Sequence, residues 1–420
     1  MISKRSFKGY LVVLLALTLI VLVACADNSG SSNSKNSDGN DNNSNSNAAG
    51  DTDGDTIKIG ATLPLTGPSA ATGEYVKDGY EYWVEQVNEN GGLLGKKVEL
   101  KIVDDKSDEA EAVSLLQNII SQDNVDLLLG GYPGTAATAQ MAIAEQHNMV
   151  YVSMGGHMKS FEQGYDYSFG APPLMGEWWY SSFFDFLETL PEDERPTKAA
   201  IITANNPVGQ SVLTNSKNGL ERLGIEIVVD ELYDLPLDSA ETLVNKAKQA
   251  GADIFFANGF FDDGVQTIRA IRSLDYQPKA ILQGIGSLTP EWQEELGDEG
   301  DYIFSGTVMH PALPFDGVEE LNEYSEEKYG SAAPSYFMFG YAWGQVLEQA
   351  VEGAGELDQE AIKDWLKSNS VSTVGGEFTF DEQGLPEEFS YTTQIIDGQP
   401  VLVSPADIAT EDPVYPDPLN

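Results

Sequence analysis

The segment VDLLLGGYPGTAATAQMAIAEQHNMVYV, residues 125–152, carries the clearest structural signal in the chain. The stretch Val125–Leu129, apolar except for one Asp, predicts a buried strand. Thr135–His147 has the composition and length of a helix, and Met149–Val152 predicts a second strand. A strand, a helix and a strand in this order are typical of a βαβ unit with parallel strands and a right-handed crossover. We therefore predict an α/β fold.

The same alternation continues on both sides of this segment. Upstream we predict strands at Ile57–Leu63 and Lys97–Val103 and helices at Gly73–Asn90 and Glu109–Ser121. After Pro172-Pro173 the alternation begins again. Helices are predicted at Leu174–Leu190, Val208–Leu223, Ala240–Ala250 and Val265–Leu274, and strands at Lys198–Thr203, Ile225–Tyr233, Ile254–Asn258, Lys279–Gln283 and Tyr302–Val308. Two successive doubly wound units predict two lobes, and the folded part is too long for one core.

The last hundred residues follow a different pattern. Helices are predicted at Leu321–Tyr329, Tyr336–Gly353 and Gln359–Lys367, and a closing hairpin is predicted from Gly376–Phe380 and Tyr391–Ile396. We expect this part to return to both lobes. The N-terminal lobe would then comprise residues 56–171 and 309–372, and the C-terminal lobe would comprise residues 172–308 and 373–410.

The first 24 residues have the pattern of a signal peptide. Lys4, Arg5 and Lys8 precede an apolar run from residue 10 to residue 24. The run is shorter than the roughly 20 residues that a membrane-spanning helix needs. It ends in Leu22-Val23-Ala24-Cys25, which resembles a bacterial lipobox. That resemblance implies that Cys25, the one Cys of the chain, carries lipid and becomes the mature N-terminus; the alternative is a plain membrane anchor.

Residues 25–55 consist mainly of Asn, Ser, Gly and Asp, and after Cys25 they include no large apolar residue. Such a segment cannot bury a core, so we predict a disordered tether between the lipid and the folded part. The expected location is extracytoplasmic, with the protein lipid-anchored to the outer face of the cell membrane.

The chain is strongly acidic. It has 67 Asp and Glu against 23 Lys and Arg, a net charge of −44. Nucleic acid is excluded as a partner, because binding to phosphates needs basic patches. We favour adaptation to salt, in which surface carboxylates keep the protein soluble, over a surface that attracts cations.

Three stretches carry a family resemblance. They are Ile57–Gly60 followed by Leu63–Pro68 and Gly73; NENGGLLGKKV at 88–98; and Asp104-Asp105 with Ser107-Asp108 and Ala112-Val113. In this order they resemble the type I periplasmic binding proteins of the branched-chain amino acid (Leu/Ile/Val) ABC transporter class. The resemblance implies two Rossmann-like lobes joined by a three-strand hinge. It also implies a monomer without cofactor that captures a small ligand between the lobes and delivers it to a membrane permease.

The candidate ligand-binding residues of the first lobe lie in loops that follow strands. Parallel sheets bind ligands beyond the carboxyl ends of their strands, where helix N-termini offer free N–H groups to a carboxylate. Thr72 follows the first strand and could also cap the helix. By the resemblance, the backbone N–H of Gly134 and the hydroxyl of Thr135 would bind a ligand carboxylate, next to Tyr132. Gly156 and His157 follow the fourth strand, where the imidazole would replace a family Thr.

The candidates of the second lobe are mostly apolar. They are Val208, Phe260, Phe261, Asp262 and Ile285. Acids that hold the ligand ammonium in amino-acid binders of this family are replaced here by Ile285 and Leu174. Asp262 or Asp263 could substitute, because a buried ammonium needs a carboxylate. Otherwise the ligand carries no ammonium. We expect an amino-acid-like or apolar, including aromatic, carboxylate or amide.

Other functions are less consistent with the sequence. His147, His157 and His310 form no HExxH pattern, Gly-x-Ser-x-Gly is absent, and no acids have metal-ligand spacing. An enzyme and a metal site are therefore not expected. A sensing protein that serves a signalling partner is the first alternative, although a receptor would carry a transmembrane helix and a signalling module after the domain. A binder of urea or amides is the second alternative.

Overall fold

The computed structural model describes residues 56–419. The predicted signal peptide, the predicted lipidation site Cys25 and the predicted tether lie outside these residues. Within the described part, no helix combines the length and the apolar character needed to cross a membrane.

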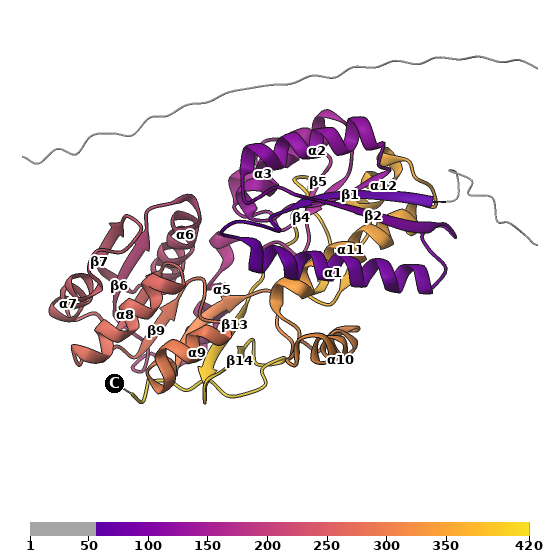
Figure 1. The fold of residues 1–420 in the computed structure, drawn as a ribbon. Helices are drawn as coiled ribbons and strands as arrows, with labels where there is room; N and C mark the ends of the chain where they lie inside the picture. Colours follow the sequence, from indigo (N-terminus) through magenta and orange to yellow (C-terminus); the bar gives the residue numbers. More distant parts are fainter. Residues whose placement is uncertain (1–55, 420) are drawn as a thin grey trace, which may run out of the picture. The chain divides into compact units, whose positions relative to one another are not determined.

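The N-terminal lobe contains a five-stranded parallel sheet with the order β2-β1-β3-β4-β5. Its elements follow one another along the chain as a strand–helix alternation (Figure 1): β1 (Thr56–Leu63), α1 (Ala70–Glu89), β2 (Lys97–Asp104), α2 (Glu109–Asp123), β3 (Leu127–Leu129), α3 (Gly134–Gln146), β4 (Tyr151–Ser153), α4 (Met158–Phe161) and β5 (Ser168–Gly170). The short strands β3 and β4 are completely buried, as expected for the centre of a sheet that is covered on both faces.

The C-terminal lobe contains a seven-stranded sheet with the order β14-β13-β10-β9-β8-β6-β7. Its contiguous part comprises the 3₁₀ helix η1 (Gly176–Trp178), α5 (Ser181–Thr189), β6 (Lys198–Ala204), α6 (Pro207–Arg222), β7 (Glu226–Tyr233), α7 (Ala240–Ala250), β8 (Ile254–Asn258), α8 (Phe261–Ser273), β9 (Ala280–Gln283), α9 (Pro290–Leu296), the 3₁₀ helix η2 (Gly297–Gly300) and β10 (Ile303–Thr307). In β8, Phe255 and Phe256 are fully buried in different apolar clusters, because successive side chains of a strand point to opposite faces.

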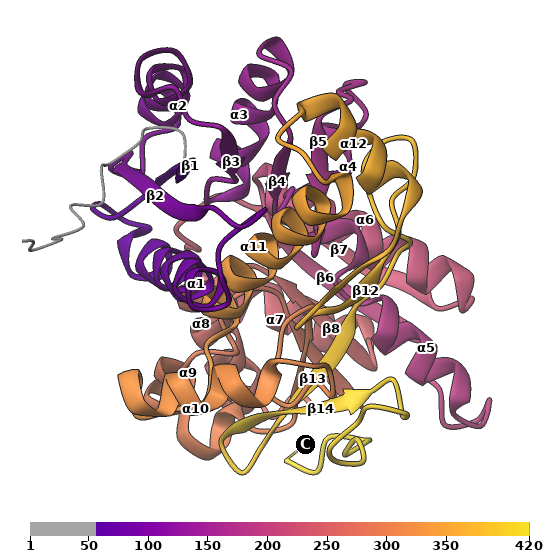
Figure 2. The ribbon, with the colours of Figure 1, turned by 90° about the vertical axis from the view of Figure 1, so that its right-hand side faces the viewer.

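The chain then returns to the N-terminal lobe and finally to the C-terminal sheet (Figure 2). This part comprises α10 (Val318–Tyr329), α11 (Ser335–Ala354), α12 (Gln359–Ser368), β11 (Val371–Thr373), β12 (Gly376–Phe378), β13 (Tyr391–Ile396) and β14 (Gln399–Ser404). The chain therefore crosses between the two α/β units three times: before η1, after β10 and between β12 and β13. Two α/β units connected by three chain crossings are the arrangement that we predicted from the sequence.

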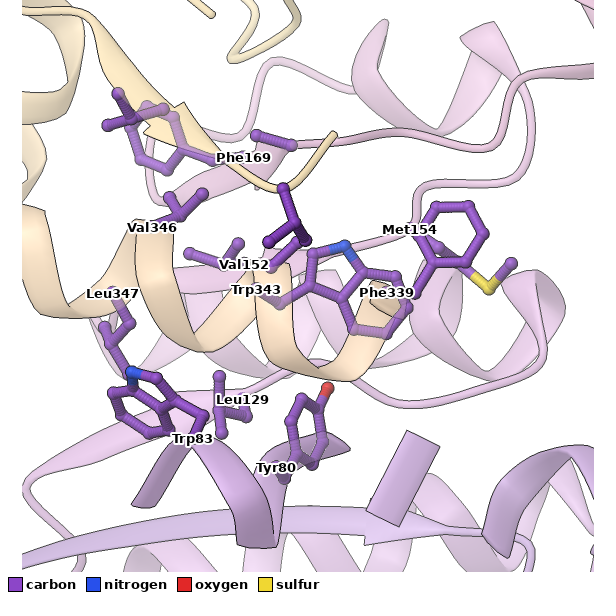
Figure 3. Close-up of a cluster of buried hydrophobic side chains, with 14 of the residues drawn as sticks. Tyr80, Trp83, Leu129, Val152, Met154, Phe169, Phe339, Trp343, Val346 and Leu347 are labelled. Atoms are coloured by element: carbon purple, nitrogen blue, oxygen red, sulfur yellow. The ribbon is translucent and has the colours of Figure 1, made fainter. Parts of the chain in front are cut away.

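The core of the N-terminal lobe forms where α11 packs against α1 and the sheet (Figure 3). Trp83 and Tyr80 of α1, Trp343 of α11 and Leu129 of β3 are all buried in it. The two helices approach closely because Gly340 lies at their contact: a Cβ added there would be 2.3 Å from the carbonyl oxygen of Val76. Tight backbone contact thus replaces side-chain packing at this point.

Two predicted elements differ in the structure. The predicted helix Leu174–Leu190 is divided into η1 and α5, because the backbone at Gly176 lies directly against α6: a Cβ there would be 1.8 Å from Oγ of Ser211.

The predicted hairpin from Gly376–Phe380 and Tyr391–Ile396 is wrong. β12 pairs with β11, while β13 pairs with β10 and β14. A two-residue turn decides the second pairing. Asp397 and Gly398 have φ angles of 51° and 74°, as a type I′ turn requires, so β13 closes on the strand that follows it.

Candidate ligand-binding site

Thr72 and Tyr132 come together on the first lobe. Thr72 lies in the first turn of α1, whose N-cap is Ser69, so Thr72 is not the cap. The Tyr132 hydroxyl shares hydrogen bonds with Thr72 and Tyr336, and burial raises the pKa of Tyr132 above its ordinary value of 10. Tyr336, in the first turn of α11, meets the Tyr132 ring edge-on with 5.2 Å between ring centroids. Three hydroxyl groups from three elements thus form one cluster.

The loops after β3 and β4 touch each other through glycines. Gly134 is the first residue of α3, and a Cβ at this position would lie 3.0 Å from Cα of Gly156. Gly156 itself has a φ of 130°, a conformation that favours glycine. Thr135, the next residue of α3, is exposed. The structure therefore brings Gly134 and Gly156 together at the N-terminus of α3, where free N–H groups and the helix dipole favour an anion.

His157 is connected to the same helix through hydroxyl groups. Its Nδ1 lies 3.1 Å from Oγ of Ser160, which is 2.8 Å from Oγ1 of Thr138. The Thr138 hydroxyl in turn donates to the carbonyl oxygen of Gly134 at 2.8 Å. His157 is partly buried next to Gly156, so the predicted first-lobe residues of these two loops lie beside one another.

A buried polar network supports the loop after β3 from below. The N–H of Gly131 donates to the Tyr151 hydroxyl at 2.8 Å, Tyr151 donates to Oε1 of Gln140 at 2.6 Å, and Nε2 of Gln140 donates to Thr62 at 2.5 Å. Asp105 lies close to Thr62, and its Oδ2 is buried without a hydrogen-bond donor among the described residues. Burial, opposed by a hydrogen bond from Ser107 and reinforced by the Asp104 charge, raises the pKa of Asp105 to about 6. The network fixes the loop that carries Tyr132 and Gly134.

The second lobe contributes an apolar hollow. Val208, Phe260 and Ile285 line it, together with Gly209, Val212, Asn258, Gly259 and Gly284. Its volume is about 10 Å³, the room of a single water molecule. Nearly all its lining is apolar or backbone, so in this structure it offers an apolar ligand group a wall rather than a pocket of the ligand's own size.

Two predicted residues of this lobe lie apart from the hollow. Phe261 packs against Trp292 with 6.4 Å between ring centroids, and Asp262 is exposed. The neighbouring Asp263 is buried, and its Oδ2 accepts hydrogen bonds from the Phe260 N–H at 3.0 Å and from the Tyr233 hydroxyl at 2.9 Å. Its carboxylate therefore caps α8.

Two further residues near these loops were not predicted as ligand-binding residues. Tyr336 reaches Tyr132 from a helix more than 200 residues later, so no local pattern could identify it. Glu177 lies in η1 directly before Trp178, Trp179 and Tyr180, whose large rings indicate core packing in this stretch. Within residues 56–419, no three His, Cys, Asp or Glu side chains gather as a metal site.

Comparisons with known proteins agree with this architecture. A family model described as periplasmic binding protein matches residues 56–399. A Leu/Ile/Val-binding protein homolog of Brucella abortus is 26% identical over 366 residues, covering 83% of this chain and 91% of that relative. Among solved structures, a putative branched-chain amino acid ABC transporter protein from Silicibacter pomeroyi superposes with a TM-score of 0.80 at 20% identity, covering 87% of this chain and 100% of the other.

A third similar protein is known with an aromatic ligand. It is a solute-binding protein from R. palustris in complex with benzoate, with a TM-score of 0.69 at 18% identity, covering 85% of this chain and 98% of the other. Proteins of this family are solute-binding components of ABC transporters rather than enzymes; they act outside the cytoplasm and present small molecules to a permease. The chain belongs to the periplasmic binding proteins, in the type I class of the branched-chain amino acid transporters.

Proposed function

We propose that the protein captures a small amino-acid-like or apolar carboxylate or amide, aromatic acids included, and closes its lobes around it. The observation that carries this proposal is the chemical difference between the two sets of loops. The first lobe offers hydroxyl groups and the N-terminus of α3, which suit a polar head group. The second lobe offers the hollow of Val208, Phe260 and Ile285, which suits an apolar body.

The similar proteins support this range of ligands. The Brucella relative is named for Leu, Ile and Val, and the R. palustris protein was solved with benzoate. Both kinds of ligand combine a carboxylate with an apolar group, which is the combination that the two sets of loops favour.

We further propose the mechanical division of the chain. Residues 56–171 with 309–372 would move as one lobe and residues 172–308 with 373–410 as the other, by hinge bending at the three crossovers. Cys25 would carry the lipid, and residues 26–55 would tether a monomer to the outer face of the cell membrane. Partitioning of the mature protein into detergent measures this anchoring.

The proposed function is tested by a thermal-shift screen of the purified full-length protein. The panel contains branched-chain and aromatic amino acids, their deaminated acids, simple amides, urea and benzoate. A ligand that binds only the folded state stabilises it, by about 2.7 kcal/mol at a concentration of 100 times Kd. We expect an apolar carboxylate or amide to raise the melting temperature. A shift with urea alone, chemical conversion of a panel compound, or no shift at all would contradict the proposal.

A further inference from the structure

The connection between β7 and α7 forms a recess on the second lobe. The recess has a volume of about 420 Å³, and every residue that lines it belongs to the segment 233–243. Leu235, Pro236, Leu237 and Leu243 give it an apolar wall, and we call it the β7–α7 recess. A small-molecule site surrounds most of its ligand, whereas a wall built from one segment leaves its other sides free for a second surface.

Apolar side chains are unusually exposed at this place. Within residues 56–419, the large apolar side chains that remain exposed are Leu232, Leu235 and Leu419, with exposed fractions of 51%, 48% and 46%. The first two lie close together in the chain, because Leu232 is near the end of β7 and Leu235 lines the recess. Exposed apolar side chains that gather beside a recess and have polar neighbours are typical of protein interaction surfaces.

Carboxylates flank the apolar wall on both sides. Asp234 and Asp238 line the recess directly before and directly after Leu235–Leu237, and both are exposed. The nearby Glu231 carboxylate is paired with Lys246. Asp234 and Asp238, by contrast, belong to none of the ion pairs between residues 56 and 419. The recess therefore presents two negative charges without a basic partner around an apolar centre.

Hydrogen bonds fix the recess to neighbouring loops of the same lobe. The Tyr233 hydroxyl donates to Oδ2 of Asp263 at 2.9 Å, and the same oxygen accepts a hydrogen bond from the N–H of Phe260 at 3.0 Å. Oδ1 of Asp234 accepts a hydrogen bond from Nδ2 of Asn205 at 3.1 Å. The recess is thus held in shape before a partner arrives, which lowers the entropic cost of binding.

We infer that the β7–α7 recess binds a segment of another protein in which an apolar side chain stands between Lys or Arg residues. The apolar side chain fills the recess, and the basic side chains pair with Asp234 and Asp238, so that both polarity and charge are complementary. A second copy of this chain, docked recess to recess, would bring acids against acids, and anionic lipid headgroups are repelled in the same way. The inference goes beyond the proposed function and does not depend on which ligand the protein captures.

The test measures the binding of two synthetic peptides to the full chain. One peptide has the sequence GRKLLKRG, and the other, GRKSSKRG, keeps the charge but lacks the apolar side chains. Kd is measured by fluorescence anisotropy of the labelled peptides at about 0.15 M NaCl, where charges farther away than about 8 Å are largely screened. The recess variants are Leu235→Ser and the double variant Asp234→Asn with Asp238→Asn, and all three side chains are exposed.

Each recess variant has a matched control elsewhere on the surface. Leu419→Ser removes an exposed leucine at a distant point of the chain. The double variant Glu323→Gln with Glu326→Gln removes two exposed acids from α10, which is the same change in net charge as in the recess.

We expect wild type to bind the leucine peptide about 10-fold more tightly than the serine peptide. Leu235→Ser and the double Asn variant should each lose about 10-fold in affinity for the leucine peptide, and the controls should change by less than about 2-fold. Equal binding of the two peptides, or equal losses in the recess variants and the controls, would mean attraction to the acidic surface as a whole and would overturn the inference. Self-association of wild type in the ultracentrifuge that Leu235→Ser abolishes would overturn it too, because the recess would then bind a second copy of the chain.

Discussion

At the scale of single residues, Asp105 is buried in the network that supports the loop after β3. Its pKa is raised to about 6, mainly by burial, against an ordinary value of 3.8. The folded state therefore holds this proton more tightly than the unfolded state does. The stabilisation from the protonated group is complete below about pH 4, and it is lost as the pH rises through about 6.

Replacement of Asp105 by Asn therefore has an effect that depends on pH. The amide resembles the protonated acid, so we expect Asp105→Asn to melt at a higher temperature than wild type at pH 7.5 and at nearly the same temperature at pH 4.5. Differential scanning fluorimetry across this range measures the gap, with Asp193→Asn in an exposed loop as the control. A gap that does not change with pH would contradict the assigned cause of the shift.

The candidate residues show how far a local pattern predicts a site. Thr72, Gly134 and Gly156 follow strands that the apolar runs identify, so their place at the sheet edge could be predicted, and the structure places them there. Phe260 and Phe261 are neighbours in the sequence, yet one lines the hollow and the other packs on Trp292. Which of the two rings faces the hollow depends on the residue at which α8 begins. The sequence does not define the start of a helix to within one residue.

At the scale of elements, the contact of α1 with α11 depends on glycine. Gly340 would normally be a weak point of a helix, because glycine is less favourable than alanine there by about 1 kcal/mol. Here the missing side chain allows its backbone to lie against Val76 of α1, and Gly79 does the same against Phe337. Close packing outweighs helix propensity at this contact.

The sign of the change in stability caused by Gly340→Ala tests that conclusion. Propensity alone predicts stabilisation, whereas an added Cβ 2.3 Å from the Val76 carbonyl oxygen must push the helices apart. We expect a loss of about 1–3 kcal/mol in the free energy of unfolding, measured by urea denaturation. Ala110→Leu, on an exposed position of α2, is the control for added volume, because leucine is close to alanine in helix propensity; it should change the free energy of unfolding by less than about 0.5 kcal/mol. An increase in stability with Gly340→Ala would show that α1 and α11 can move apart at this contact without a cost in free energy.

Long periodic helices and buried strands were the elements that the sequence predicted well. The elements that the sequence did not predict are short, or they depend on contacts with other elements of the fold. β5 has three residues at the edge of its sheet and pairs with β4, and η1 lies where the backbone of Gly176 meets α6. The β13–β14 pairing, by contrast, had a local signal in Asp397-Gly398, and the predicted hairpin overlooked it.

At the scale of the whole molecule, the charge of −44 dominates the electrostatics. Most ion pairs of the described residues lie on the surface, where each is worth little, and they leave a large excess of carboxylates. Folding therefore brings like charges closer together than they are in the unfolded chain, and their repulsion destabilises the folded state.

Salt should relieve this repulsion, because the screening length falls from about 10 Å at 0.1 M to about 3 Å at 1 M. We expect the melting temperature to rise steadily between 0.1 and 2 M NaCl. The triple variant Glu323→Gln, Glu326→Gln and Glu327→Gln, which neutralises exposed acids of α10, should melt higher at low salt and show a smaller rise. A melting temperature that is independent of salt would argue against adaptation to salt.

The return of α11 to the first lobe also orders the events of synthesis. Trp83 of α1 donates a hydrogen bond to Glu348 of α11, 265 positions later, and the core around these residues is incomplete until both are present. All of β6 to β10 leaves the ribosome before α11 does. The first lobe therefore stays unfinished while β6 to β10 are made, and the second sheet gains β13 and β14 later still, so α1 waits with its apolar face uncovered until α11 has been synthesised.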